Sequence, residues 1–371
     1  MHSLIRTIIA WAFIGAGLAG TAAADNWKNI TPESEPGLAG REIQVMETIG
    51  DELWIGTLSG LSRYRGGKFE VMKAVQIKKK RKWVKKDGKR KRVVEEVKEV
   101  KPAKYQAWGV VKTGKDRYLV GTNRGLFTLD GDTFLAQVHV SGTVSPVAGF
   151  GEKSMWALAK RSDTEENAVY RKTNGEWKPV ETFSGKRVAD MFRTRDGRIW
   201  VVIDGNGVIA ADPAREPDEW VHYQKGMNIK SLFMDSRGRV WCGFWNRGIA
   251  VLDGNAWTTY LAHDISDSAV LKITEDKAGN IWAATNADGL WRYDGEGWNS
   301  YLKDEGPVNL LYAASDGKVW ASTQMRGGLR FFKDREWHVS LDSPLPMRCI
   351  VEYKGALWAG GVLDGLHVKK M

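Results

Sequence analysis

Residues 273–302, with the sequence ITEDKAGNIWAATNADGLWRYDGEGWNSYL, decide the fold of this 371-residue chain. The segment holds four short apolar or alternating runs, separated by turns rich in Gly, Asp and Asn. Such runs between turn residues are typical of a four-stranded antiparallel meander. Its second run carries Trp282 and its fourth carries Trp298, so two aromatic positions mark the unit.

The same pattern recurs eight times along the chain. The residues equivalent to Trp282 in the other copies are Trp54, Leu119, Trp156, Trp200, Trp241, Trp320 and Trp358. The fourth-run aromatic residues are Phe69, Phe134, Trp177, Trp220, Trp257, Trp298 and Trp337. From Leu119 onward the copies are 37 to 44 residues apart. Eight four-stranded units of this length predict an all-β fold, an eight-bladed β-propeller.

The eighth copy lacks its fourth run, because the sequence ends at Met371 shortly after the third. The missing run has a counterpart near the other end: residues 26–30, NWKNI, are similar to residues 297–301, GWNSY. We therefore predict that the N-terminal segment supplies the outer strand of the last blade. This pairing closes the ring and removes a bare sheet edge.

Residues 1–24 have the features of a secretory signal peptide. Arg6 provides the charged start, residues 7–20 are mostly apolar, and Ala24 ends a small-residue cleavage site. A membrane anchor is the alternative, disfavoured because the apolar stretch is short and no basic cluster follows it. We expect residues 25–371 to form one monomeric propeller domain, in the periplasm or outside the cell.

The net charge of +10 is concentrated in residues 73–104, which hold 15 Lys or Arg against 4 Asp or Glu. Asp87-Gly88 is a strong two-residue hairpin turn, and pairing around it sets Lys80 opposite Glu95 and Trp83 opposite Arg92. The sequence predicts a basic β-hairpin inserted between blades one and two, which we expect to rise from the channel-mouth face. Its tip comprises Lys78, Lys79, Lys80, Arg81, Lys82, Trp83, Lys85, Lys86, Lys89, Arg90, Lys91 and Arg92.

Repulsion among these cations favours an anionic partner. Outside the cytoplasm the candidates are a lipid headgroup, an acidic polysaccharide or an acidic protein, whereas export disfavours nucleic acid. The alternative is a solvated arm that only maintains solubility. Binding through the arm would weaken steeply as ionic strength rises.

A second candidate site lies at the channel mouth, the face that in propellers carries the second-to-third loops and the starts of the inner strands. The residues predicted to line it are Trp108, Arg124, Lys230, Trp245, Arg247, Asn309, Arg326 and Arg348. Cations with two aromatic rings suit an anionic or sugar-like ligand. They are also compatible with ordinary solvated turns, because Asn206, Asp288 and Asp364 occupy the same loop position in other copies.

The sequence contains no nucleophile elbow, P-loop or dinucleotide fingerprint. The histidines are scattered and no CxxC motif is present, so we expect neither a metal nor a cofactor. Cys242 and Cys349 fall in blades five and eight, too far apart for a disulfide. We expect two buried free thiols.

The repeat resembles the two-component regulator propeller repeats of bacterial sensor proteins. The resemblance rests on residues 53–57, LWIGT, with Gly60-Leu61, and on residues 281–285, IWAAT, with Gly289-Leu290. It extends over nearly all of the mature chain and implies an extracytoplasmic sensing propeller. In the membrane sensors a transmembrane helix and signalling domains follow the propeller. This sequence stops after the last blade, so we expect no direct role as a signalling receptor.

Together these features predict an exported, non-enzymatic propeller that binds a ligand or protein, with the basic hairpin and channel mouth engaging an anionic partner. The alternative is a lyase or hydrolase acting on an anionic glycan or small molecule at the mouth. A clustered His, Glu or Asp pair there would favour the enzyme, and only Arg, Asn and Trp would favour binding.

Overall fold

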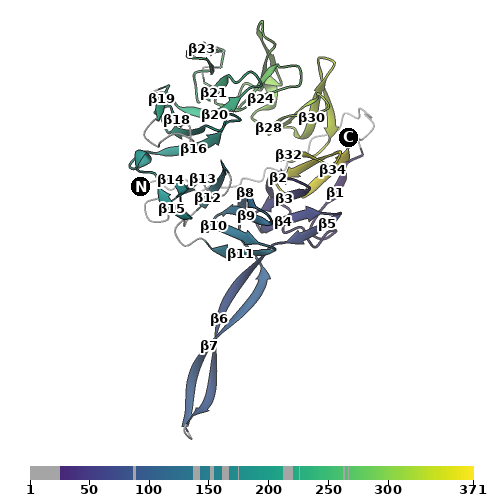
Figure 1. The fold of residues 1–371 in the computed structure, drawn as a ribbon. Coiled ribbons are helices and arrows are strands. Elements are labelled where there is room, and N and C mark those ends of the chain that lie inside the picture. The colour runs from purple at the N-terminus through teal and green to yellow at the C-terminus, as the bar shows by residue number, and fades with distance from the viewer. Residues whose placement is uncertain are drawn as a thin grey trace.

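The structure is a computed structural model that describes residues 26–86, 89–136, 143–150, 154–160, 167–173, 175–211, 220–224, 226–261, 264–265 and 267–371. These residues form eight antiparallel blades of four strands around a central axis (Figure 1). The predicted eight-bladed, all-β fold is confirmed. The predicted signal peptide lies outside the described residues. Where the structure is described, no helical segment has the length and apolarity needed to span a bilayer.

Each blade runs from an inner strand at the channel to an outer strand at the rim. The inner strands are β2 (Ile43–Ile49), β8 (Ala107–Gly114), β12 (Thr143–Phe150), β16 (Val188–Arg193), β20 (Ile229–Met234), β24 (Val270–Glu275), β28 (Val308–Ala313) and β32 (Met347–Tyr353). The second strands are β3 (Glu52–Thr57), β9 (Arg117–Thr122), β13 (Ser154–Lys160), β17 (Ile199–Ile203), β21 (Val240–Phe244), β25 (Ile281–Thr285), β29 (Val319–Thr323) and β33 (Ala356–Gly361).

The third and outer strands complete the blades. The third strands are β4 (Gly60–Arg65), β10 (Gly125–Asp130), β14 (Asn167–Thr173), β18 (Val208–Ala211), β22 (Ile249–Asp253), β26 (Leu290–Tyr293), β30 (Gly327–Lys333) and β34 (Leu366–Lys370). The outer strands are β5 (Lys68–Val71), β11 (Thr133–Ala136), β15 (Glu176–Pro179), β19 (Val221–Tyr223), β23 (Ala256–Tyr260), β27 (Trp298–Tyr301), β31 (Glu336–Leu341) and β1 (Lys28–Ile30). Two short 3-10 turns cover Glu181–Phe183 and Lys303–Glu305.

The N-terminal strand closes the ring, as the sequence predicted. β1 pairs antiparallel with β34, setting Asn29 opposite His367, and so becomes the outer strand of blade eight. Trp27, just before β1, packs edge-on against Trp320 of blade seven, with ring centroids 6.1 Å apart. Both ends of the described chain are therefore held in one sheet.

Aromatic residues fasten each blade to the next. The second-strand residue Trp282 contacts the outer-strand residue Trp337 of the following blade at 5.9 Å, and Trp241 contacts Trp298 at 6.3 Å. The second-strand tryptophans are almost fully buried, with Trp200 and Trp282 showing no exposed surface. Large rings fill the space between twisted sheets well, which is why the two aromatic positions recur in nearly every unit.

The Gly-Thr pair that ends the LWIGT motif also has a structural reason. A Cβ atom on Gly56 would lie 2.6 Å from the carbonyl oxygen of Ala107 in the next blade, so only glycine permits the close approach. The hydroxyl of Thr57 donates to the carbonyl of Gly60 and accepts from its amide, both at 3.0 Å. These residues set the spacing of the blades and the loop that leads to the channel mouth.

Candidate functional site

The basic hairpin is formed by β6 (Lys73–Lys86) and β7 (Lys89–Pro102), here called the basic arm. Its backbone register pairs Lys80 with Glu95, Lys79 with Glu96, and Trp83 with Arg92. This is the register that the sequence predicted. The charge alternation of the two strands and the position of the Asp-Gly dipeptide were sufficient to find it.

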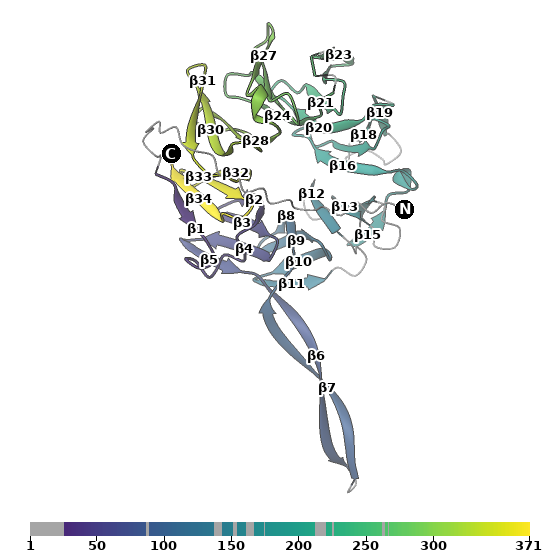
Figure 2. The ribbon, with the colours of Figure 1, turned by 180° about the vertical axis from the view of Figure 1, so that it is seen from behind.

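The direction of the arm differs from the prediction. We expected it to rise from the channel-mouth face, but it leaves the rim of the ring and runs outward beyond β11 (Figures 1 and 2). The cause is a parallel pairing of β6 with β11, in which Lys73 faces Thr133 and Ala74 faces Phe134. This pairing makes the arm an extension of the sheet of blade two, whose strand order is β7-β6-β11-β10-β9-β8.

Hydrogen bonds on both strands hold the base of the arm. The amide of Ala103 donates to the carbonyl of Met72, and the amide of Lys73 donates to the carbonyl of Asp132, both at 2.9 Å. The Lys73 ammonium forms an ion pair with the Asp132 carboxylate at 2.7 Å. This contact raises the pKa of Lys73 and lowers that of Asp132, in each case mainly through the side-chain hydrogen bond. Met72 is fully buried, so the arm starts from a fixed point.

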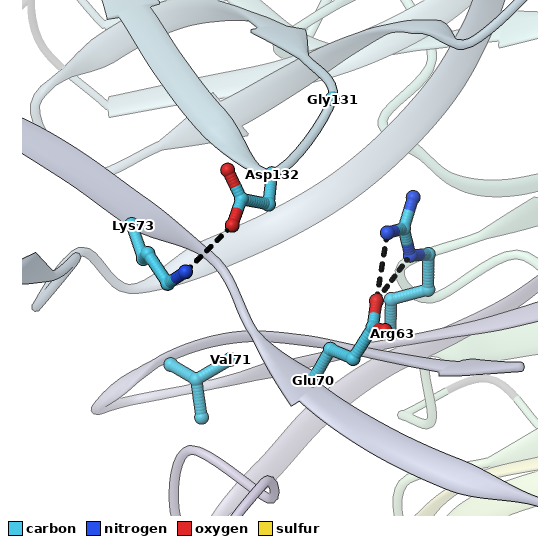
Figure 3. Close-up of a pocket in the computed structure, with 6 residues that line it drawn as sticks. All are labelled: Arg63, Glu70, Val71, Lys73, Gly131 and Asp132. Carbon is cyan, nitrogen blue, oxygen red and sulfur yellow. Dashed lines mark hydrogen bonds and ion pairs between the residues drawn. The ribbon is translucent and has the colours of Figure 1, made fainter.

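A small polar pocket lies at this base, lined by Arg63, Glu70, Val71, Lys73, Gly131 and Asp132 (Figure 3). Its charges are already paired, since Arg63 binds Glu70 at 2.7 Å and Lys73 binds Asp132. The pocket is therefore an anchor between blades one and two, with no charged group left over for a ligand.

A buried carboxylate reinforces the same interface. Glu52, at 3% exposure, accepts hydrogen bonds from the Tyr118 hydroxyl of blade two at 2.6 Å and from the Trp54 indole at 3.2 Å. Arg65 lies 3.1 Å from its other oxygen and Arg63 lies 3.6 Å away. Burial and the bond to Glu52 raise the pKa of Tyr118. The contacts tie the blade before the arm to the blade that carries it.

At the channel mouth, an irregularity of the inner strands selects the residues presented there. The pairing of the inner and second strands is interrupted in all eight blades, and in seven of them a one-residue shift falls near the start of the inner strand. Such a β-bulge leaves one residue unpaired and re-aims its side chain. The unpaired residues are Gln44, Trp108, Ala189, Lys230, Leu271, Asn309 and Arg348. Four of the predicted mouth residues thus share one structural position.

Two of the predicted mouth cations, Lys230 and Arg348, make separate contacts with neighbouring side chains. Lys230 lies over the ring of Trp245, with its ammonium 4.7 Å from the centroid. Arg348 donates to the Gln44 amide oxygen of the neighbouring blade at 2.7 Å.

The other predicted residues take no part in these two contacts. Arg124, in the loop after β9, lies over Tyr105, 5.6 Å from the ring centroid. Arg247, Asn309 and Arg326 are exposed on blades five and seven, and Trp108 is half-buried on blade two.

The mouth also carries exposed apolar residues, and apart from Trp245 the sequence analysis did not single them out. Trp245 is 48% exposed, Met325 73% and Leu363 50%, each in a second-to-third loop, and Leu271 is exposed at a bulge position. Exposed apolar surface beside cations is common at binding faces. These residues could have been found from the sequence by their place in the second-to-third loops, since Met325 lies directly beside the predicted residue Arg326.

Two carboxylates on inner strands were likewise missed. Burial raises the pKa of Glu47 to about 7, although an amide of Val110 opposes the shift, and burial also raises the pKa of Asp190. The Asp190 residue is exposed to solvent, although the protein atoms around its carboxyl group are dense enough to raise its pKa. We attribute both properties to a position on the innermost strand, which borders the central channel.

The two cysteines are free, as predicted, and the described residues contain no group of three His, Cys, Asp or Glu at metal-binding distances. Cys242 is fully buried, but the prediction that Cys349 is also buried needs correction. Cys349, which follows the bulge residue Arg348 on the innermost strand, is only partly buried. Desolvation raises both thiol pKa values to about 12.

No protein-family model and no curated protein matches the chain. Solved structures do. The extracellular domain of a one-component system from B. thetaiotaomicron is similar with a TM-score of 0.51 and 15% identity, over 90% of this chain and 51% of that one. This chain thus spans about half the length of that protein.

Two other similar structures are propellers from different settings. YCF48 bound to a D1 peptide gives a TM-score of 0.54 and 14% identity over 94% of this chain and 96% of its own. Virginiamycin B lyase from Staphylococcus aureus gives a TM-score of 0.51 and 12% identity, over 71% of this chain and 94% of its own. At these identities the likeness establishes the fold, a β-propeller of the kind that also forms the extracellular part of a bacterial sensor system.

Proposed function

We propose that this protein is an exported, non-enzymatic binding propeller that docks on an anionic component of the cell envelope. The observation that carries the proposal is the separation of charge. The arm contains nearly all of the excess positive charge, and it extends away from a ring that is close to neutral. A cationic element at the end of an extension raises the local concentration of anionic partners and leaves the ring as a scaffold.

The channel mouth supplies a second contact in this proposal. Lys230 offers a charged donor beside the aromatic face of Trp245, and Arg348 offers a second charged donor next to the Gln44 amide. Such pairs suit carboxylate or sulfate groups and sugar rings. The similar structures are consistent with a binding role, since one is an extracellular sensor domain and another has a bound peptide.

The test is a pull-down from envelope extract with the mature protein and with a variant that lacks Val75 to Val100, each at low and high salt. We expect a partner that is lost both on deletion and at high salt, because exposed charges are screened. A partner that the deletion variant retains would instead assign binding to the mouth. An arm whose removal changes nothing would refute the proposal.

An enzyme remains the second candidate because of one observation, the carboxylates Glu47 and Asp190 with raised pKa values on inner strands. A carboxyl that keeps its proton near neutral pH can act as a general acid. The described histidines lie elsewhere, with His222, His338 and His367 on outer and third strands. Release of new chain ends from an acidic polysaccharide by the wild type, and not by Glu47→Gln, would support this candidate.

A further inference from the structure

The register of the basic arm sorts its residues onto two different faces. Side chains alternate between the faces of a strand, and directly paired residues share a face. By the backbone register, the positions Arg81–Val94, Trp83–Arg92 and Lys85–Arg90 therefore belong to one face of the ribbon. This face holds every arginine of the arm and its only aromatic residue. The opposite face holds lysines: Lys78, Lys80, Lys82, Lys86, Lys89 and Lys91.

Charge is also divided along the length of the arm. In the half near the ring, acidic residues oppose basic ones, as in Lys79–Glu96 and Lys80–Glu95. From Arg81 to Lys86 and from Lys89 to Val94, every charged residue is basic. Trp83 lies within this distal part and is 66% exposed. An exposed indole offers a partner an apolar ring with one polar N–H group.

An arginine- and tryptophan-bearing face at the end of a long ribbon fits a lipid surface better than a soluble polyanion. Tryptophan favours the headgroup level of a bilayer, where its ring is half apolar and half wet. Guanidinium groups bind phosphates with two parallel hydrogen bonds. A flexible polymer would gain from charge along the whole ribbon, whereas a flat surface reaches only its end.

We propose that the Trp83 face of the arm docks into the headgroup region of an anionic bilayer and holds the ring away from it. The inference rests on the proposed function and names its partner. Fourteen-residue strands span about 45 Å, so the tip meets the surface without requiring the ring to approach. The bonds of Lys73 and Ala103 anchor the base of the arm to the ring.

The experiment places an environment-sensitive fluorophore on the full mature chain through Trp83→Cys. The native thiols are poorly reactive, because burial raises their pKa values to about 12. The matched control is Val100→Cys, on the same face but at the base of the arm and 56% exposed. The probes are vesicles of phosphatidylcholine alone, vesicles of equal parts phosphatidylcholine and phosphatidylglycerol, and the soluble polyanion alginate.

We expect the label at position 83 to shift to the blue with the anionic vesicles alone, and the label at position 100 to stay unchanged. Unlabelled protein should cosediment with the same vesicles. Arg90→Ala with Arg92→Ala should weaken this binding about 25-fold, since each basic residue near such a surface contributes about fivefold. Trp83→Ala should weaken it roughly tenfold.

Two outcomes would overturn the membrane assignment in different ways. Salt-sensitive binding of alginate, with no vesicle binding and no shift at position 83, would make the partner a soluble polyanion and leave the proposed function standing. Failure to bind either probe, together with an unchanged pull-down after deletion of the arm, would overturn both proposals.

Discussion

Glu52 provides the sharpest test of how the ring supports the arm. Its buried carboxylate receives the Tyr118 hydroxyl at 2.6 Å and faces Arg65 at 3.1 Å and Arg63 at 3.6 Å. Glu52→Gln keeps the volume of the side chain but removes the charge. Loss of one partner from a buried ion pair costs about 3 to 5 kcal/mol. Because Arg63 keeps Glu70 at 2.7 Å, we expect the lower end, about 3 kcal/mol.

The Tyr118 side of the contact can be measured separately. Tyr118→Phe removes a hydroxyl that donates to a charged acceptor, which corresponds to about 2 kcal/mol. The double variant should lose less than the two single losses together, by about 1 kcal/mol, since both act on one carboxylate. The assay is urea unfolding followed by far-ultraviolet circular dichroism.

An exposed ion pair serves as the control. Glu33 lies 2.9 Å from Arg41, and its side chain is 64% exposed. Glu33→Gln should leave the unfolding midpoint unchanged, because exposed pairs contribute little. The reasoning is refuted if Glu52→Gln is no more costly than Glu33→Gln, or if the Glu52 and Tyr118 losses add within about 0.5 kcal/mol.

Three further outcomes are expected. Between pH 4.5 and about 7 the folded Glu47 carboxyl holds a proton that the unfolded chain has released, so stability falls as pH rises through this window; Glu47→Gln should therefore be more stable than wild type by about 3 kcal/mol near pH 8 and equal to it near pH 4 in urea titrations. Asp132→Asn should speed hydrogen exchange of the Lys73 amide without moving the Tm, and unchanged exchange would show that the backbone alone anchors the arm. Arg247→Ala and Arg326→Ala should weaken capture of small acidic glycans at equal Tm, whereas unchanged affinity in both would exclude the mouth.

The blades could be predicted from the sequence because their determinants are local and repeated. Trp282, Trp298 and their equivalents stand at fixed distances from turn residues, so one clear copy identifies the others. Even the exception has a local explanation. Where Leu119 replaces tryptophan, the ring of the adjacent Tyr118 packs at a tilt against Trp54 of the neighbouring blade, with the centroids 4.6 Å apart, and the interface keeps its aromatic contact.

The direction of the arm could not be predicted, because it depends on the pairing of Ala74 with Phe134, which are far apart in the sequence. The channel mouth was found only in part for a related reason. Gln44 and Leu271 occupy the same structural position as Lys230, but this equivalence can be recognised only from the register shifts of the inner strands. Alternating sequence patterns do not show where a strand gains an extra residue.

The pairing of β1 with β34 has a consequence for the order in which the chain folds during synthesis. Synthesis from the N-terminus produces Trp27 and Lys28–Ile30 before the seven blades that separate them from their partner strand, Leu366–Lys370. The N-terminal strand therefore lacks its native pairing partner until these blades have been made. Closing so long a loop is slow compared with forming one meander, so we expect ring closure to follow the formation of the individual blades. A chain that is cut short near its C-terminus would leave two open edges for other chains to occupy.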